Sequence, residues 1–314
     1  MLKKDQETSQ SIKLVGLDNY FDEMINLYES GRFPKVLLLN GKKGIGKFTL
    51  IFHFLNYIYS KKEKNSYNLS DKLINIDSKF YNSVLNNTTN EAIFIQAEEG
   101  ENIKIEVIRN LKSLLSKTSL SNNKRFIIID DVEFLNANSA NALLKSLEEP
   151  SEDNYFILIN NQQADLIETI KSRCIINNIY LNLDLQQKVI DYLTTNNKID
   201  FISDNTKTLT PGLLSKYTKL INKYKVNVSD NVMIKLNKLL HAYKKDKNKA
   251  LIGLSIYLID QYFYNLIKEN ENKIDFLINL KLNINNKIND FIVYNLNINS
   301  VLNTIELNLK NVRE

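Results

Sequence analysis

Five short apolar runs in the first 181 residues constrain the fold of this chain more than any other feature. They are VLLLN (36–40), AIFIQ (92–96), FIIID (126–130), YFILI (155–159) and IINNIYL (175–181). Runs this apolar are typical of strands that are buried on both faces of a parallel sheet.

Helical patterns separate these runs. Apolar residues recur at helical spacing after residue 47, in NIKIEVIRNLKSLL (102–115) and in SANALLKSLEEP (139–150), where Pro150 ends the helix. Strands that alternate with helices predict an α/β domain with a doubly wound, five-stranded parallel sheet. Residues 60–90 are polar and predict a surface excursion. After residue 182 the pattern is helical to the end, and we predict helix also for 280–289, although its alternation suits a strand.

Composition excludes several classes of protein. The net charge is only +5, and one cysteine, Cys174, excludes a disulfide framework and a clustered-cysteine zinc site. His53 and His241 do not make a metal site. The polar first ten residues and the lack of a run of about 20 apolar residues predict a cytoplasmic protein without a membrane span.

The stretch LNGKKGIGKFTL (39–50) predicts a phosphate-binding loop between a buried strand and a helix. Its glycines expose backbone N–H groups to phosphate oxygens, and Lys47 adds a positive charge. The candidate nucleotide-binding residues are Gly41, Lys43, Gly44, Ile45, Gly46, Lys47, Phe48 and Thr49.

One position of this loop departs from the working pattern. Phe48 stands where a serine or threonine would hold magnesium, and the hydroxyl comes one residue later, at Thr49. The next residue of a helix is rotated by about 100°, so Thr49 faces away from the metal. Binding of ATP or ADP with magnesium is therefore left open.

Two further motifs could carry chemistry. The run FIIID ends in Asp130 and Asp131, where a Walker B acid would sit, although a solvated acidic loop is the competing interpretation. Arg173 lies in Ser172-Arg173-Cys174 and is one of only five arginines in a chain that otherwise takes lysine for positive charge. An exposed arginine at a domain edge can complete a phosphate site in a neighbouring subunit.

Taken together, LLLNGKKGIGKFTL, FIIIDDVEFLNANSANALLKSLEEP and YFILINNQQADLIETIKSRC resemble the clamp-loader branch of the AAA+ ATPases. Within that branch they are most similar to the delta-prime family of bacterial DNA polymerase III subunits. The resemblance implies an AAA+ nucleotide-binding domain (1–182), a small helical lid (183–224) and an all-α C-terminal collar (225–314). It also implies that Arg173 is a trans arginine finger, that Cys174 is a packing residue, and that Asn160 or Asn161 is at the first sensor position.

The partners implied by this resemblance are the motor gamma/tau and delta subunits in a hetero-pentameric ring, the sliding clamp, and primer-template DNA. Three departures from the motor pattern predict weak or no hydrolysis by this chain: Phe48 in the loop, Asp131 after Asp130, and Leu213 or Leu214 near the expected lid arginine. The zinc module that many relatives carry is also missing.

Three alternatives compete with this interpretation. A motor-type clamp-loader ATPase would need Thr49 to replace the missing hydroxyl. A P-loop nucleotide phosphotransferase would need an arginine-rich lid, which the sequence lacks. A non-catalytic AAA+ scaffold unrelated to replication is disfavoured by the SLEEP and SRC runs.

Overall fold

The computed structural model describes residues 11–97, 101–115, 124–197, 209–227 and 229–310. They divide into two compact units. One unit holds the described residues up to Asn197 together with Leu209–Leu213, and the other holds the described residues from Leu214 onward. Each unit is described by itself.

The first unit is built on a five-stranded parallel sheet, as the sequence predicted. Its strands are β1 (Val36–Asn40), β2 (Ala92–Gln96), β3 (Arg125–Asp130), β4 (Asn154–Asn160) and β5 (Ile175–Asn178). Their order across the sheet is β2-β3-β4-β1-β5, and all neighbours are parallel. The register pairs Gln96 with Asp130 and Asn40 with Asn160, so polar residues gather at the carboxyl edge of the sheet.

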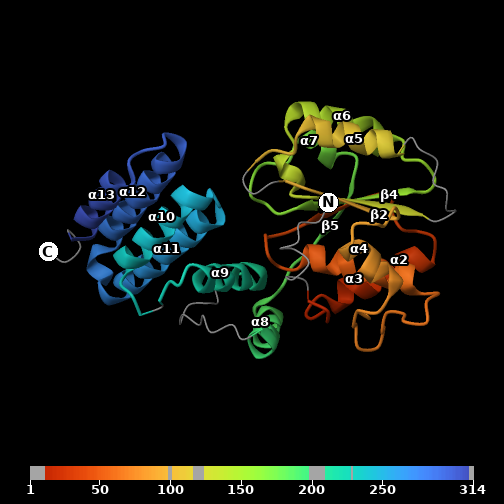
Figure 1. The fold of residues 1–314 in the computed structure, drawn as a ribbon, viewed down its shortest axis with the longest axis horizontal. Helices are drawn as coiled ribbons and strands as arrows, with labels where there is room; N and C mark the ends of the chain where they lie inside the picture. The colour runs from red at the N-terminus through yellow and green to blue at the C-terminus, as the bar shows by residue number, and fades with distance from the viewer. Residues whose placement is uncertain (1–10, 98–100, 116–123, 198–208, 228, 311–314) are drawn as a thin grey trace. The chain divides into compact units, whose positions relative to one another are not determined.

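Helices cover both faces of this sheet (Figure 1). One face packs against α2 (Asp18–Glu29), α3 (Lys47–Ser60) and α4 (Lys79–Leu85), and the other against α5 (Ile105–Leu115) and α6 (Ala137–Glu148). Strand β1, which lies between β4 and β5, contributes alternate residues to the two cores. Leu37 and Leu39 belong to the first core, and Val36 and Leu38 belong to the second.

Two expectations about this unit need correction. The run 175–181 is not a strand buried on both faces: β5 ends at Asn178, and Ile175 is 65% exposed. The reason is that β5 is an edge strand, bonded to β1 alone. The polar segment 60–90 contains the short helix α4, and the amino-terminal helix α2 was not predicted.

The remaining helices follow β5. They are α8 (Leu183–Asn197), α9 (Pro211–Lys223), α10 (Val232–Asp246), α11 (Ala250–Glu269), α12 (Ile274–Val293) and α13 (Ile298–Lys310). In the second unit α10, α11, α12 and α13 pack in succession, and α13 returns to α10. The helix predicted for 280–289 lies inside α12, so that prediction is confirmed.

Helix α11 is the core helix of the second unit. By length and composition it could cross a membrane, but half of its most apolar window is buried inside the structure. Leu251, Leu254 and Phe263 on this helix have no exposed surface. Its apolar character is therefore accounted for by its packing against α10 and α12.

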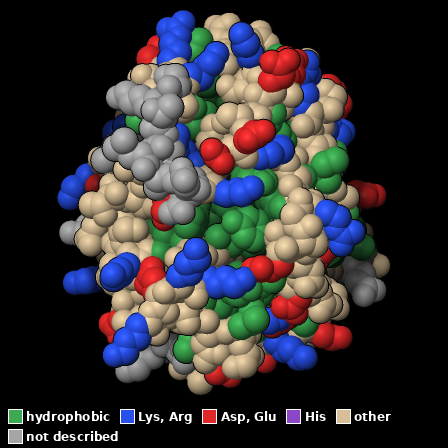
Figure 2. Space-filling view, turned by 90° about the vertical axis from the view of Figure 1, so that its right-hand side faces the viewer, with side chains coloured by type: hydrophobic (Ala, Val, Ile, Leu, Met, Phe, Trp, Pro, Cys, Tyr) green, Lys and Arg blue, Asp and Glu red, His purple; other side chains and the backbone are tan. Residues whose placement is uncertain are grey.

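Lysine side chains lie over an aromatic ring near the amino ends of β1, β3 and β4. The Nζ atom of Lys35 is 4.0 Å from the centroid of the Tyr155 ring, and that of Lys124 is 5.3 Å from it. Ammonium groups placed over the Tyr155 ring are attracted to its negative face. On one face of the molecule, shown in Figure 2, exposed hydrophobic side chains are bordered by lysine and arginine.

Candidate functional site

The glycine loop has the strand-loop-helix setting that the sequence predicted, and its glycines are needed for their conformation. Gly44 and Gly46 have φ of +83° and +98°, where a side chain would be strained. A Cβ atom on Gly41 would lie 2.5 Å from the carbonyl oxygen of Ile179. Glycine is therefore required at these positions of the loop, which leads into α3 at Lys47.

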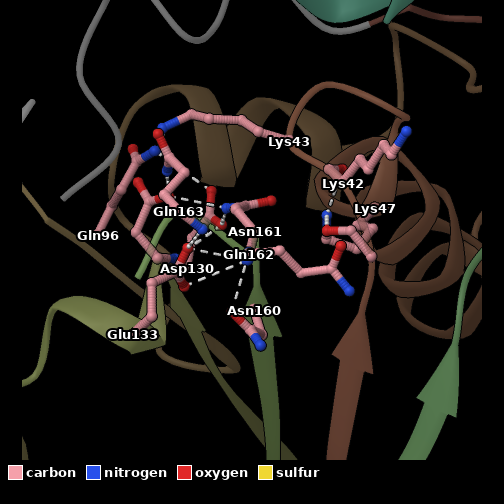
Figure 3. A network of polar contacts seen from close by, with 12 residues as sticks. Lys42, Lys43, Lys47, Gln96, Asp130, Glu133, Asn160, Asn161, Gln162 and Gln163 are labelled. Carbon is pink, nitrogen blue, oxygen red and sulfur yellow. Dashed lines mark hydrogen bonds and ion pairs between the residues drawn. The ribbon is translucent and has the colours of Figure 1, made fainter. Parts of the chain in front are cut away.

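The Lys47 ammonium group is hydrogen-bonded to carbonyl oxygens of its own loop (Figure 3). Its Nζ donates to the carbonyl oxygen of Gly41 at 2.6 Å and to that of Lys42 at 2.8 Å. The side chain is almost fully buried, and burial lowers the pKa of Lys47 to about 8 although nearby carboxylates oppose that shift. A phosphate group would have to replace these carbonyl contacts.

Phe48 is used for packing. Its ring lies against the Phe94 ring of β2, with the centroids 5.7 Å apart, and it borders the core under α3. A residue in this place with a hydroxyl could hold a metal, whereas phenylalanine extends the hydrophobic core. Thr49 is partly buried on the next position of the helix.

The two acids at the end of β3 and one amide at the end of β4 meet at the carboxyl edge of the sheet. Asn161 Nδ2 donates to Asp130 Oδ1 and to Asp131 Oδ1, both at 2.8 Å. All three residues are buried. Burial, and after it the adjacent Asp131 carboxylate, raises the pKa of Asp130.

Other polar residues complete this network, which is drawn in Figure 3. Lys43 Nζ lies 3.3 Å from Asp131 Oδ1, Gln163 donates to the same oxygen, and Gln96 donates to Asp130 Oδ2. Glu133, only 5% exposed, accepts the backbone N–H of Asn161 at 3.0 Å. The acidic segment is thus a buried, hydrogen-bonded network, and the alternative of a solvated loop is wrong.

Of the two sensor candidates, only Asn161 joins the acids. Asn160 turns its amide to the neighbouring strand and donates to Asn40 Oδ1 at 3.0 Å. The structure therefore brings together the loop lysine Lys43, both acids and Asn161, and it leaves Asn160 outside this group.

The start of α9 lies on the glycine loop within the first unit. The N–H of Gly212 donates to the carbonyl oxygen of Gly44 at 2.8 Å, and Thr210 Oγ1 donates to that of Lys43 at 2.7 Å. Leu213, one of the two residues near the expected lid arginine, has its backbone N 3.0 Å from a Cβ built on Gly44. With the loop capped and Lys47 engaged, these residues do not fit magnesium and ATP in this arrangement.

Arg173 lies away from this network, between α7 (Glu168–Lys171) and β5. Its side chain is 30% exposed and is held by Glu148 and by the carbonyl oxygen of Thr169. The next residue, Cys174, borders the hydrophobic core, and burial raises the pKa of its thiol to about 11. Packing and a neutral thiol agree with the packing role expected for Cys174.

Sequence reasoning missed several members of the site. Gln96 could have been found, because AIFIQ ends at the same sheet edge as FIIID and its last residue is polar. The role of Glu133 as the anchor of the Asn161 backbone, and the contact of Thr210 and Gly212 with the loop, have no local signal. Both depend on segments that are distant in the sequence.

The chain is similar in sequence to known subunits of a bacterial DNA polymerase. A family model described as "DNA polymerase III, delta subunit" matches residues 16–181, more than half of the chain. The delta-prime subunit of DNA polymerase III from Buchnera aphidicola (subsp. Schizaphis graminum) is 29% identical over 59% of this chain and 54% of its own length. The Pseudomonas aeruginosa delta-prime subunit is 32% identical over 44% of this chain and 40% of its own length.

The chain spans about half the length, or less, of these curated relatives. Among solved structures, a gamma subunit-related protein from Thermotoga maritima aligns with 93% of this chain and 97% of its own, at 20% identity and a TM-score of 0.47. On the family match and these relatives, the chain belongs to the DNA polymerase III delta-subunit family, and its resemblance to delta-prime subunits is confirmed.

Proposed function

We propose that this chain is a stator-type delta-prime subunit of a bacterial clamp loader, with Arg173 as an arginine finger for ATP bound by a neighbouring motor subunit. The observation that carries the proposal is a contrast within the first unit. Lys47 of the chain's own loop is buried and hydrogen-bonded to that loop, whereas the Arg173 side chain is partly exposed at a turn, where Glu148 and Thr169 hold it near the surface. A subunit of this kind would add charge to another subunit's site without turning over ATP itself.

The chemistry asked of Arg173 is electrostatic. Phosphoryl transfer spreads negative charge over the oxygens of the transferred group, and a guanidinium that reaches these oxygens stabilises the transition state. Arginine suits this task because it stays protonated and presents several N–H donors in a planar fork. The exposed turn before β5 leaves the guanidinium accessible to a second protein.

The contacts within the glycine loop (residues 41–47) support the other half of the proposal, that this chain hydrolyses little or no ATP. Lys47 bonds two carbonyl oxygens of its own loop, Phe48 offers no ligand to magnesium, and Gly212 caps Gly44. The runner-up, a motor-type ATPase, would require both sets of contacts to open before each turnover and would still lack a metal ligand at position 48.

We further propose that the helices from α10 to α13 form the collar through which the subunit assembles with gamma/tau and delta subunits. Exposed apolar side chains on α12, among them Phe276, Leu282 and Val293, support this role. Exposed apolar surface of this kind is often covered in an assembly. The sliding clamp and primer-template DNA are the further partners of the proposed complex, and 183–224 is its proposed lid.

The experiment that tests the proposal is ATP turnover by the reconstituted complex with Arg173→Ala. Arginine fingers contribute about 10³–10⁵ in kcat, so turnover at the neighbouring site should fall at least about tenfold. Arg109→Ala, which changes an exposed residue of α5, is the matched control and should leave turnover unchanged. Gel filtration checks that all variants assemble, and unchanged DNA-stimulated turnover in Arg173→Ala would refute the arginine-finger role.

A further inference from the structure

The carboxylate of Glu148 holds the Arg173 side chain. Glu148 Oε1 accepts the Nε–H of Arg173 at 2.8 Å and also accepts from Nη2. On the other side of the guanidinium, Nη1 donates to the carbonyl oxygen of Thr169 at 2.8 Å. Nη1 also donates to Ser172 Oγ at 3.4 Å, so the guanidinium is held by three groups of its own chain.

These contacts leave a usable part of the guanidinium. Arginine has five N–H donors, and the contacts to Glu148, Thr169 and Ser172 engage up to four of them. A hydrogen on Nη2, one of the two atoms farthest along the side chain, is left for another acceptor. A phosphate oxygen from another subunit could thus be met while the Nε edge stays anchored on Glu148.

The anchor itself is rigidly placed. Glu148 is the last residue of α6, whose Leu143 and Leu147 are buried in the same core as Ile170 of α7. The helices α6 and α7 are in contact, and Cys174 packs against the same core. Both ends of the ion pair are therefore fixed to one hydrophobic cluster, which keeps their separation constant.

Stability does not explain this ion pair. The two side chains are 30% and 46% exposed, and ion pairs exposed to this degree contribute little to folding free energy. What the pair does fix is the rotamer of a long side chain that has many alternatives. A long side chain that must reach a distant charge benefits from such preorganisation.

We propose that Glu148 is a positioning residue that orients the Arg173 guanidinium toward the neighbouring subunit's nucleotide. This inference rests on the proposed arginine-finger function and adds a second residue to it. Glu148 touches no reacting atom; it acts only through Arg173.

The test uses the reconstituted complex with Glu148→Ala and Glu148→Gln. Alanine removes the acceptor, so kcat should fall about fivefold to tenfold while the KM for ATP is unchanged, because the neighbouring subunit binds the nucleotide. Glutamine keeps an oxygen acceptor at the same place and should restore most of kcat. Glu149→Ala is the matched control, since Glu149 is the exposed neighbour in the same run.

A double mutant separates positioning from a general structural effect. In an Arg173→Ala background, Glu148→Ala should cause no further loss. A loss in that background, an unchanged kcat for Glu148→Ala, or a gain in turnover would each overturn the positioning role. If Arg173→Ala itself leaves turnover unchanged, the proposed function fails, and this result is distinguishable from the failure of Glu148 alone.

Discussion

The N–H of Gly212 donates to the carbonyl oxygen of Gly44 across 2.8 Å. This bond joins the start of α9 to the glycine loop, two segments that are far apart in the sequence. Neither position leaves room for a side chain, because a Cβ on Gly212 would lie 2.8 Å from Gly44 Cα. The loop is consequently covered by the chain's own backbone.

A first prediction concerns this contact. Gly212→Ala should force the start of α9 away from the loop, because the new Cβ would meet backbone atoms that cannot yield. Overpacking of this kind costs about 1–3 kcal/mol. Amide hydrogen exchange in residues 41–47 should therefore become faster. Gly253→Ala, which meets only the end of the Tyr217 side chain, is the control and should leave exchange in the loop unchanged.

A second prediction concerns nucleotide binding by the isolated chain. Calorimetric titration with magnesium and ATP should give no heat at millimolar nucleotide, because Lys47 is engaged and Phe48 supplies no metal ligand. Lys47→Ala should give the same result. If the native chain bound ATP with a micromolar Kd and Lys47→Ala did not, the glycine loop would be open to nucleotide, and this subunit would act as a sensor of ATP.

A third prediction concerns the amide that joins the two acids. Asn161→Ala removes a donor shared by two buried carboxylates, Asp130 and Asp131. Hydrogen bonds to charged groups contribute about 1.5–3 kcal/mol, so the free energy of unfolding should fall by about 3 kcal/mol in urea at a pH of about 8, above the raised pKa of Asp130. Asn160→Ala, which loses a bond to a neutral amide, should cost about 1 kcal/mol. Equal losses in the two variants would show that the charges are not the cause.

Much of the fold could be predicted from the sequence because buried parallel strands have continuous apolar sequences. All five runs became strands of the sheet. Their order could not be predicted, since it depends on packing between helices. Consequently the edge position of β5 was missed, and with it the exposure of Ile175. The helix α4 is only seven residues long and lies in a polar segment, so its periodicity is weak.

The sequence predicts where the candidate site lies, but not the contacts that its loop and lysine make. Asp130, Asp131 and Asn161 all follow strands that end at the carboxyl edge of one parallel sheet, and they meet because β3 and β4 are neighbours in it. The direction of the Lys47 side chain depends on whether its own carbonyl groups or a phosphate attract it, which no spacing reveals. The closure by Gly212 depends on a distant segment for the same reason.

The last prediction concerns the pH dependence of stability through His53, which is fully buried on α3. Its ring nitrogens lie 2.9 Å from Tyr67 Oη and 2.9 Å from the carbonyl oxygen of Ser11, and burial lowers its pKa to about 4 from the ordinary 6.5. Between pH 6.5 and about 4 the imidazole of the unfolded chain binds a proton more tightly than that of the folded chain. The free energy of unfolding should therefore fall as the pH decreases through this range, by up to about 3 kcal/mol. Urea unfolding of the native chain and of His53→Gln across this range isolates the effect. The free energy of unfolding of His53→Gln should no longer fall by this amount as the pH decreases. His241 is exposed on α10, so His241→Gln is the control and should behave like the native chain. Parallel slopes for the native chain and His53→Gln would mean that the imidazole is not held in its neutral form.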